Sequence, residues 1–379
     1  MTETTNILNL KTDKEFNFMG VRQYVSRKVA KTTTVDEQLK KIVEEARARI
    51  KVVGVGGAGN NTITRLMQHE LHGIKTIAIN TDARDLLNTD AHQKILIGKK
   101  ITKGIGAGSD PKLGAEAARE SKEEIKKALA NSDLVFLTGG LGGGTGSGAL
   151  PIVAEIAKRE GALVVAVVTL PFSMEGKQRQ RNAIEALVNL EKNVDTLIVI
   201  PNDKLKEIVP HLTLIQAFEF CDEILIRAVK GISDLINKPG LVNRDFADVK
   251  TIMSNSGLSM IGIGESRSEN RAKESVDRAL NHPLITVDIS NAKGALIYIT
   301  SGPETTLKEV EEIVTYIHEK LGEESKIIWG ASIDRNLGKV IRTTVIVTGV
   351  TSPNIFSSEK PFSSVVKSVE ETFGIEFIK

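Results

Sequence analysis

Three glycine-bearing stretches in the first half of the sequence have the residue types and spacing of anion-binding turns. They are Gly54–Gly59, Gly104–Gly108 and Gly139–Gly148. Glycine permits positive φ angles and close approach of the main chain, and the N–H groups of such a turn attract phosphate together with a following helix N-terminus. We interpret the third stretch as a phosphate-binding turn rather than a flexible linker, because the apolar run Leu134–Leu137 precedes it and a helical pattern follows it.

The first stretch also fits the pattern G-x-G-x-x-G, with Gly54, Gly56 and Gly59, and Asp82 ends the next predicted strand segment. This is the fingerprint of a dinucleotide-binding fold with its ribose-binding acid, so an NAD-dependent oxidoreductase is an alternative. Against it, several phosphate-type turns suit a polyphosphate longer than one pyrophosphate. The second half shows no His/Asp or Ser/Tyr/Lys arrangement for hydride chemistry. No G-x-x-x-x-G-K-[ST] motif is present, which excludes an ordinary P-loop nucleotidase.

The composition is that of an ordinary globular protein. The 379 residues are 41% hydrophobic and 26% charged, enough for two domains with their own cores. A formal charge of +2 gives no case for nucleic-acid binding. Cys221 is the only cysteine, which excludes a disulfide framework and a cysteine metal site. No apolar run approaches the roughly 20 residues of a membrane span. We therefore expect a cytoplasmic protein with no direct membrane insertion.

Strand and helix patterns alternate from Ile50 to about residue 200. Near-continuous Val, Ile and Leu runs with helices between them predict a Rossmann-like parallel sheet covered on both faces. Such a sheet binds ligands beyond the carboxyl ends of its strands, where the glycine turns lie. The predicted strands are 51–55, 75–79, 134–137, 163–169 and 196–200, and the predicted helices lie near 60–72, 112–130, 146–160 and 178–192.

A long helical pattern follows, from about Leu214 to Asn237, and it is apolar on most faces. We interpret it as a central helix buried between two domains. Strands at 258–264, 295–301, 327–333 and 340–349, with helices near 268–281 and 306–321, then predict a smaller α+β domain. The predicted organisation is an N-terminal extension (1–37), a nucleotide-binding α/β domain (38–213), the central helix (214–238), the α+β domain (239–350) and a C-terminal tail (351–379).

The third glycine stretch is similar to the signature GGGTG[ST]G of the tubulin/FtsZ family. Further segments stand in the order found in that family, and the resemblance runs from about residue 38 to 350, without the longer insertions of tubulin. The 1–37 extension and the absence of an acidic Ile-Pro-x-Phe terminal peptide resemble archaeal members more than bacterial ones. The segments that carry the resemblance are Gly54–Asn61, Asn80–Asp82, Gly104–Gly108, Gly139–Gly148, Pro171–Gly176, Pro201–Lys204 and Asn243–Val249.

The resemblance implies a GTPase of the tubulin/FtsZ fold that binds GTP or GDP with Mg²⁺ and polymerises head-to-tail. Ala107 and Gly108 would meet the γ-phosphate, and Asp82 would organise Mg²⁺ and water. Mg²⁺ itself would be held by the GTP phosphates and water, with no direct protein ligand assigned. The residues implied to bind GTP are Gly56, Gly57, Ala58, Gly59, Asn60, Asn61, Asn80, Asp82, Gly106, Ala107, Gly108, Gly142, Gly143, Gly144, Thr145, Gly146, Glu175, Arg179, Phe218 and Asp222.

The resemblance assigns Glu175 and Arg179, four residues apart, to the ribose and its surroundings, although the pair alone also suits a surface ion pair. Phe218 and Asp222 are likewise four apart on the central helix. One can stack on a base, and the other can accept from guanine N1–H and N2–H₂, which adenine lacks. Without the resemblance, Phe218 reads as a core residue.

The motif Asp245-Phe-Ala-Asp248 places two carboxylates three residues apart at a helix start, which by itself is typical of N-terminal capping. The resemblance implies instead that Asp245, Asp248 and Asn243 enter the nucleotide site of the next subunit and orient the attacking water. Repetition of that heterologous contact gives an open filament. A nucleotide-binding structural protein without hydrolysis is a third alternative, disfavoured by the two carboxylates.

The resemblance further implies a septal ring at mid-cell, built from self-association of this chain. A membrane-tethering adaptor is expected to bind the C-terminal tail, with the apolar end Ile375–Ile378 as its candidate segment. No nucleic-acid partner is expected.

Overall fold

The computed structural model describes residues 47–69, 73–208, 211, 213–237, 246–285, 289–290, 292–322, 325–350, 362–373 and 375. The predicted N-terminal extension and most of the tail lie outside these ranges, and so do Asn243, Arg244 and Asp245.

The framework is a ten-stranded sheet in the order β3-β2-β1-β4-β5-β6-β7-β10-β8-β9, as far as the described residues show. Its first six strands pair only in parallel, while β10 pairs antiparallel with both β7 and β8. The strands are β1 Ile50–Val55, β2 Ile74–Asn80, β3 Gln93–Leu96, β4 Leu134–Gly140, β5 Leu163–Leu170, β6 Thr196–Pro201, β7 Gly257–Ser266, β8 Gly294–Ser301, β9 Lys326–Ile333 and β10 Ile341–Thr348.

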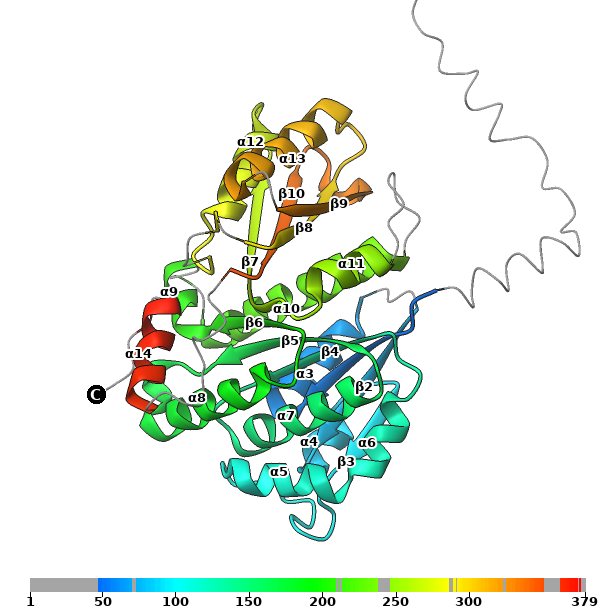
Figure 1. Cartoon of the computed structure of the whole chain (residues 1–379), viewed down its shortest axis with the longest axis vertical. Helices are drawn as coiled ribbons and strands as arrows, with labels where there is room; N and C mark the ends of the chain where they lie inside the picture. Colours follow the sequence, from blue (N-terminus) through cyan, green and yellow to red (C-terminus); the bar gives the residue numbers. More distant parts are fainter. Residues whose placement is uncertain are drawn as a thin grey trace, which may run out of the picture. The chain divides into compact units, whose positions relative to one another are not determined.

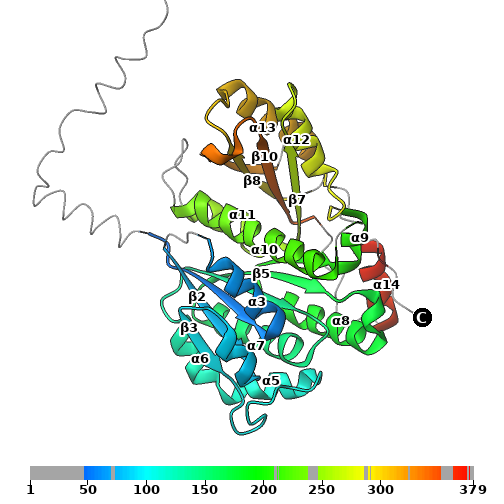
Figure 2. The ribbon, with the colours of Figure 1, turned by 180° about the vertical axis from the view of Figure 1, so that it is seen from behind.

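Helices connect the strands and cover both faces of the sheet (Figures 1 and 2). Among the described residues none of them is long and apolar enough to cross a membrane. The helices are α3 Gly56–Leu66, α4 Ala83–Asn88, α5 Pro111–Glu120, α6 Lys122–Leu129, α7 Gly144–Arg159, α8 Lys177–Glu191, α9 Leu205–Ile208, α10 Leu214–Asn237, α11 Phe246–Met253, α12 Arg271–Leu280, α13 Leu307–Leu321 and α14 Phe362–Phe373, with short 3₁₀ turns at Ser173–Glu175, Asn202–Lys204 and Arg335–Leu337.

Alternation along the strands divides the core into two layers. In β1, Val53 and Val55 belong to the layer that includes buried residues of α5, α6, α7 and α8, whereas Ile50 and Val52 belong to the layer that includes α3, α10 and α11. In the second half, α12 and α13 contribute to the first layer and α10 contributes to the second. Helix α10 therefore packs on the same face of the sheet in both halves.

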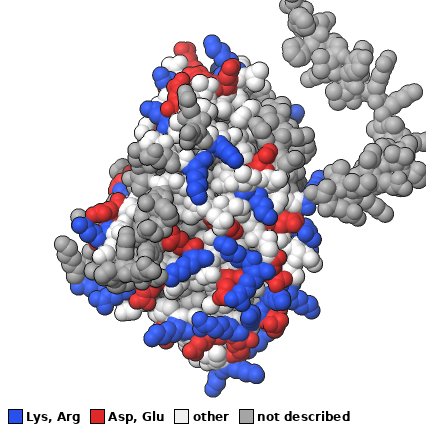
Figure 3. Space-filling view, viewed as in Figure 1, with Lys and Arg blue, Asp and Glu red and all other residues white. Residues whose placement is uncertain are grey.

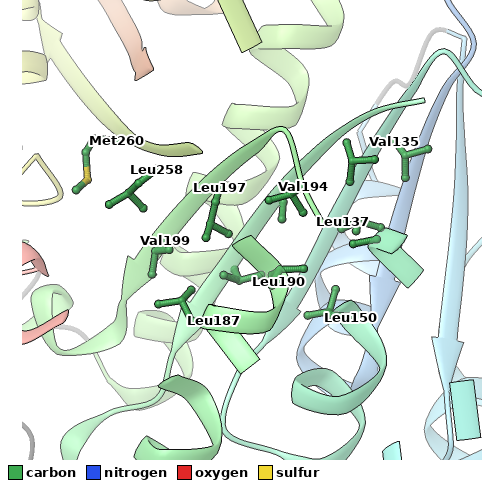
Figure 4. Close-up of a cluster of buried hydrophobic side chains, with 14 of the residues drawn as sticks. Val135, Leu137, Leu150, Leu187, Leu190, Val194, Leu197, Val199, Leu258 and Met260 are labelled. Atoms are coloured by element: carbon green, nitrogen blue, oxygen red, sulfur yellow. The ribbon is translucent and has the colours of Figure 1, made fainter. Parts of the chain in front are cut away.

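Strands β6 and β7 join the two halves of the sheet by parallel pairing. The registered pairs are Thr196–Gly257, Leu197–Leu258 and Ile198–Ser259. Buried side chains continue across this junction from β4 to β7 (Figure 4). The sequence predicted a linking helix between the halves, but it gave no sign that the two sets of strands share one sheet.

Helix α14 packs beside α8 (Figures 1 and 2). Its buried residues Val365, Val369 and Phe373 are spaced four apart and so form one stripe. Ile375 is also buried and belongs to the same core layer. The adaptor-binding segment predicted at Ile375–Ile378 thus begins at a packed residue, and residues 376–379 lie outside the described ranges.

The α/β fold class and most predicted elements agree with the structure. The single helix predicted over 112–130 is instead two, because Ser121 ends α5 and precedes α6. Strand β3 and helix α4 were not predicted, since each is short: four and six residues. On the face shown in Figure 3, Lys and Arg side chains are interspersed with Asp and Glu.

Candidate functional site

A cavity of about 520 Å³ opens beyond the carboxyl ends of β1, β4, β5 and β6. This is the edge at which parallel α/β sheets bind ligands. Its wall combines the first and third glycine stretches with side chains of α3, α8 and α10. The lining residues are Gly56, Gly57, Ala58, Asn61, Thr62, Arg65, Gly139, Gly140, Leu141, Gly143, Gly144, Thr145, Gly146, Thr169, Pro171, Glu175, Arg179, Asn202, Phe218, Cys221, Asp222 and Leu225.

The first glycine stretch forms the turn from β1 into α3. Gly56 has a φ of 74°, a value that favours glycine, and a Cβ there would lie 3.0 Å from the Gly146 nitrogen. A Cβ on Gly59 would lie 2.5 Å from the Thr138 carbonyl oxygen. Gly59 therefore lets α3 pack closely on the sheet and, unlike Gly56, does not line the cavity.

The third stretch forms the turn from β4 into α7. Gly142 has a φ of 105°, and its N–H donates to Ser147 Oγ at 2.7 Å. A Cβ on Gly146 would lie 2.3 Å from the Gly140 carbonyl oxygen, so only glycine fits. The first turns of α3 and α7 both face the cavity and contain no acidic residue. Two helix N-termini whose own first turns carry no carboxylate make this end of the cavity attractive to anions.

The second stretch, Gly104–Gly108, abuts the third without lining the cavity. A Cβ on Gly144 would lie 2.9 Å from Ala107, and the Gly106 N–H donates to the Thr81 carbonyl at 3.2 Å. Gly106 and Gly108 have positive φ angles, and a Cβ on Gly108 would meet no atom within 4 Å. All three stretches therefore meet at one edge of the sheet.

Four other predicted residues, Gly142, Asn60, Asn80 and Asp82, do not line the cavity. Asp85 Oδ2 accepts from Asn60 Nδ2 at 3.1 Å and from Asn80 Nδ2 at 2.5 Å. Asp82 caps α4 by accepting from the main-chain N–H groups of Arg84 and Asp85 through Oδ1. This network fixes the loop after β2 beside the glycine turns. Buried Asn60 Oδ1 has no hydrogen-bond partner.

The opposite end of the cavity is formed by side chains of α3 and α10. Phe218 is 43% exposed and meets Phe172 edge-to-face, with ring centroids 5.7 Å apart. Asp222 is 9% exposed and accepts from Thr62 Oγ1 at 2.6 Å, while Arg65 Nε lies 3.0 Å from its other oxygen. Burial raises the pKa of Asp222, and both partners oppose that shift. A half-exposed ring beside a buried carboxylate suits a base with adjacent donors.

Glu175 and Arg179 form an ion pair of 2.5 Å at the cavity rim. Glu175 also accepts from the Phe172 N–H at 2.8 Å, which ties the turn after β5 to the start of α8. The structure thus realises the predicted pair, and both members line the cavity.

Of the three predicted catalytic residues, only Asp248 is described. It is exposed in the first turn of α11 and does not line the cavity of its own chain. Within the described part of the chain, no group of three or more His, Cys, Asp or Glu side chains is arranged to hold a metal ion.

Several lining residues were missed from the sequence, notably Thr62, Arg65, Asn202 and Cys221. Cys221 donates to Asn202 Oδ1 at 3.3 Å, and burial raises the pKa of its thiol to about 12, so it lines the wall as an inert thiol. Thr62 and Arg65 are three apart on the helix after the first turn, a spacing that puts both on one helix face. That spacing was the signal in the sequence from which both could have been predicted to face the site.

Two family models match the chain: the GTPase domain of the tubulin/FtsZ family over residues 49–210, and the C-terminal domain of the FtsZ family over 257–351. Cell division protein FtsZ 1 of Thermococcus kodakarensis is 57% identical over 326 residues, which cover 86% of this chain and 87% of that protein. FtsZ 1 of Methanocaldococcus jannaschii is 57% identical over 317 residues, covering 84% and 87%. A solved structure of an empty FtsZ dimer from M. jannaschii matches with a TM-score of 0.81 at 56% identity, covering 86% of this chain and 95% of that one.

Proposed function

Because this chain belongs to the FtsZ family of tubulin-like cell-division GTPases, we propose that the cavity is its GTP site and that hydrolysis is completed by the next subunit of a filament. Family, fold class and GTPase activity are as the sequence resemblance predicted. The NAD-dependent oxidoreductase receives no support from the comparisons.

The observation that carries the proposal is the union, in one cavity, of two glycine-built helix N-termini with a buried carboxylate at the opposite end. The first end suits a polyphosphate, held by main-chain N–H groups around Gly57, Gly144 and Thr145. The second suits guanine, whose N1–H and N2–H₂ both donate toward Asp222, with Phe218 stacking on the base. Glu175 and Arg179 lie at the rim, where the ribose would sit.

Hydrolysis of GTP needs a group that orients the attacking water. Asp248 does not line its own cavity, but its exposed position leaves it free to enter a neighbour's. We assign Asp248, together with Asp245 and Asn243, to polarise water for in-line attack on the γ-phosphate of the adjacent subunit. Main-chain donors of the cavity then stabilise the charge that develops on the phosphoryl oxygens. Such a site exists only at a head-to-tail contact, which repeats into an open filament.

Mg²⁺ fits this arrangement as an ion held by phosphate oxygens and water. Magnesium retains several waters and takes oxygen ligands. Asp82 uses Oδ1 to cap α4, while its Oδ2 lies toward Gly106, where a Cβ would be 3.8 Å away. That oxygen can accept from a metal-bound water. A bound Mg²⁺ would supply positive charge that offsets the negative charge of the phosphates.

Self-association and cell division are properties of the matched relatives, and we extend them to a cytoplasmic ring at mid-cell. The tail is proposed to reach a membrane adaptor through residues beyond buried Ile375.

The test is phosphate release from GTP as a function of protein concentration, with ATP and NAD as controls and with Asp248→Ala beside the parent. Release should rise steeply above a threshold concentration with GTP alone. Asp248→Ala should lower turnover by roughly a hundredfold or more while GTP binding persists. Glu269→Ala, an exposed acid before α12, should behave as the parent.

Release that is linear in protein, or unaffected in Asp248→Ala, would refute a shared site. Tight NAD binding with no phosphate release from GTP would favour the NAD-dependent oxidoreductase instead.

A further inference from the structure

The carboxylate of Asp222 is held by two side chains from another helix. Its Oδ1 accepts from Thr62 Oγ1 at 2.6 Å, and Arg65 Nε lies 3.0 Å from its Oδ2. Arg65 is also 3.3 Å from Glu219, one turn before Asp222 on α10. These contacts of Thr62 and Arg65 therefore link α3 to α10 at the base end of the cavity.

A carboxylate has two oxygens and about four lone-pair sites, two on each oxygen. Thr62 occupies one site on Oδ1 and Arg65 one site on Oδ2. One site on each oxygen stays available, and guanine presents two adjacent donors, N1–H and N2–H₂. The two donors of guanine therefore match the two acceptor sites that Thr62 and Arg65 leave open on Asp222.

We propose that Thr62 and Arg65 are positioning residues for guanine specificity: they fix the plane of the Asp222 carboxylate and leave one acceptor on each oxygen for the base. The inference rests on the proposed function, since it requires the base to lie at Asp222. Neither residue need touch the nucleotide.

Charge supports the same arrangement. Burial and nearby Glu219 raise the pKa of Asp222, whereas the Thr62 hydrogen bond and the Arg65 charge lower it. The two partners thus favour the ionised form, which is the form that accepts two hydrogen bonds without donating one. An ion pair that only joined α3 to α10 would need Arg65 alone. It would not need the short hydrogen bond from the Thr62 hydroxyl to Asp222 Oδ1.

The experiment measures the affinities of the full chain for GTP, ITP and XTP in the presence of Mg²⁺. Inosine lacks the 2-amino group, so the GTP-to-ITP ratio reports the second hydrogen bond. The variants are Thr62→Val, Thr62→Ser, Arg65→Met, Arg65→Lys and Asp222→Asn. Arg159→Met, which removes an exposed ion pair with Glu155 on α7, is the matched control, and thermal unfolding checks each fold.

The parent should prefer GTP over ITP by about tenfold or more, the value of one hydrogen bond to a charged group. Thr62→Val and Arg65→Met should each lower that ratio by roughly threefold to tenfold. Thr62→Ser should restore it, and Arg65→Lys should restore it in part, because a lysine keeps the charge but not the fixed Nε–H direction. The control should match the parent.

An unchanged GTP-to-ITP ratio in the folded Thr62 and Arg65 variants overturns the positioning role. Asp222→Asn separates this failure from failure of the site itself. An amide should favour XTP, whose 2-oxo group accepts where the guanine amine donates. If Asp222→Asn keeps the parent's preference for GTP over XTP, the base does not lie at Asp222, and the proposed orientation falls with the inference.

Discussion

At the phosphate end of the cavity the binding groups belong to the main chain, whereas at the base end they belong to side chains. The phosphate end is formed where β1 and β4 turn into α3 and α7, at positions where a Cβ on Gly56 or Gly146 would meet backbone. The base end depends on Phe218 and Asp222 of α10 and on side chains of α3.

The difference predicts how each end responds to substitution. Main-chain groups cannot move without shifting a strand or a helix, so an added atom at the phosphate end acts on the whole turn. Side chains at the base end can be exchanged individually, so changes there should adjust affinity and selectivity while the fold persists.

Gly146→Ala should reduce the affinity for GTP by about a hundredfold or more. Its Cβ would lie 2.3 Å from the Gly140 carbonyl oxygen, and relieving that contact separates the strand end from the helix start. A clash of this kind costs roughly 1–3 kcal/mol of unfolding free energy. Calorimetric GTP binding and thermal unfolding measure the two effects.

Gly143→Ala is the matched control, because a Cβ there meets no protein atom within 4 Å and its φ is −83°. Its unfolding temperature should equal that of the parent. Equal stability of both alanine variants would contradict the claim that the turn is sterically fixed.

Asn182→Ala should weaken GTP binding by about tenfold and lower stability by roughly 1–3 kcal/mol. Its buried Nδ2 donates to the carbonyls of Ser109 and Gly142 at 3.1 and 3.3 Å, which joins the residue directly after the second glycine stretch to the third stretch. Asn193 lies just after α8, and its side chain donates a hydrogen bond to the Asn189 carbonyl within that helix. Asn193→Ala removes this bond and serves as the control. Normal GTP affinity in Asn182→Ala would show that the loops hold each other without it.

Lowering the pH should weaken GTP binding through protonation of Asp222. Burial raises its pKa above the ordinary value of 3.8, and guanine binds the ionised form. Affinity is therefore full above the raised pKa and falls as the pH decreases through it, starting at a higher pH than for an exposed aspartate. The phosphates titrate as well, so XTP binding to Asp222→Asn provides the baseline. If GTP binding to the parent and XTP binding to Asp222→Asn had identical pH profiles, Asp222 would be excluded as the titrating group.

Arg179→Ala should have the smallest effect, about a twofold to fivefold loss of GTP affinity at low salt. The Arg179 side chain is 48% exposed, and pairs of this exposure contribute roughly 0.2–1 kcal/mol. The loss should shrink at high ionic strength because salt screens exposed charges. A loss as large as that of Gly146→Ala would place Arg179 on the phosphates themselves.

The same contrast decides what the sequence could reveal. Glycines between an apolar strand and a helix are a local signal, and the turns at Gly54–Gly59 and Gly139–Gly148 were predicted from it. Thr62 and Arg65 were not, because their partner Asp222 is 160 residues beyond Thr62 and nothing local specifies that α3 and α10 lie together. Asp222 itself was predicted only through the family resemblance.

Long-range pairing limited the prediction of the fold in the same way. Each strand of the second half was predicted from its own apolar pattern, yet the pairing of β6 with β7 depends on tertiary packing. Strand β3 was not predicted because two of its four residues, Gln93 and Lys94, are exposed and break the apolar run.

The junction of β6 and β7 also has a mechanical consequence. Three registered residue pairs and the packed length of α10 connect the two halves side by side. A pull on one half is therefore shared between the paired strands and α10, whereas a single linking segment would carry it alone.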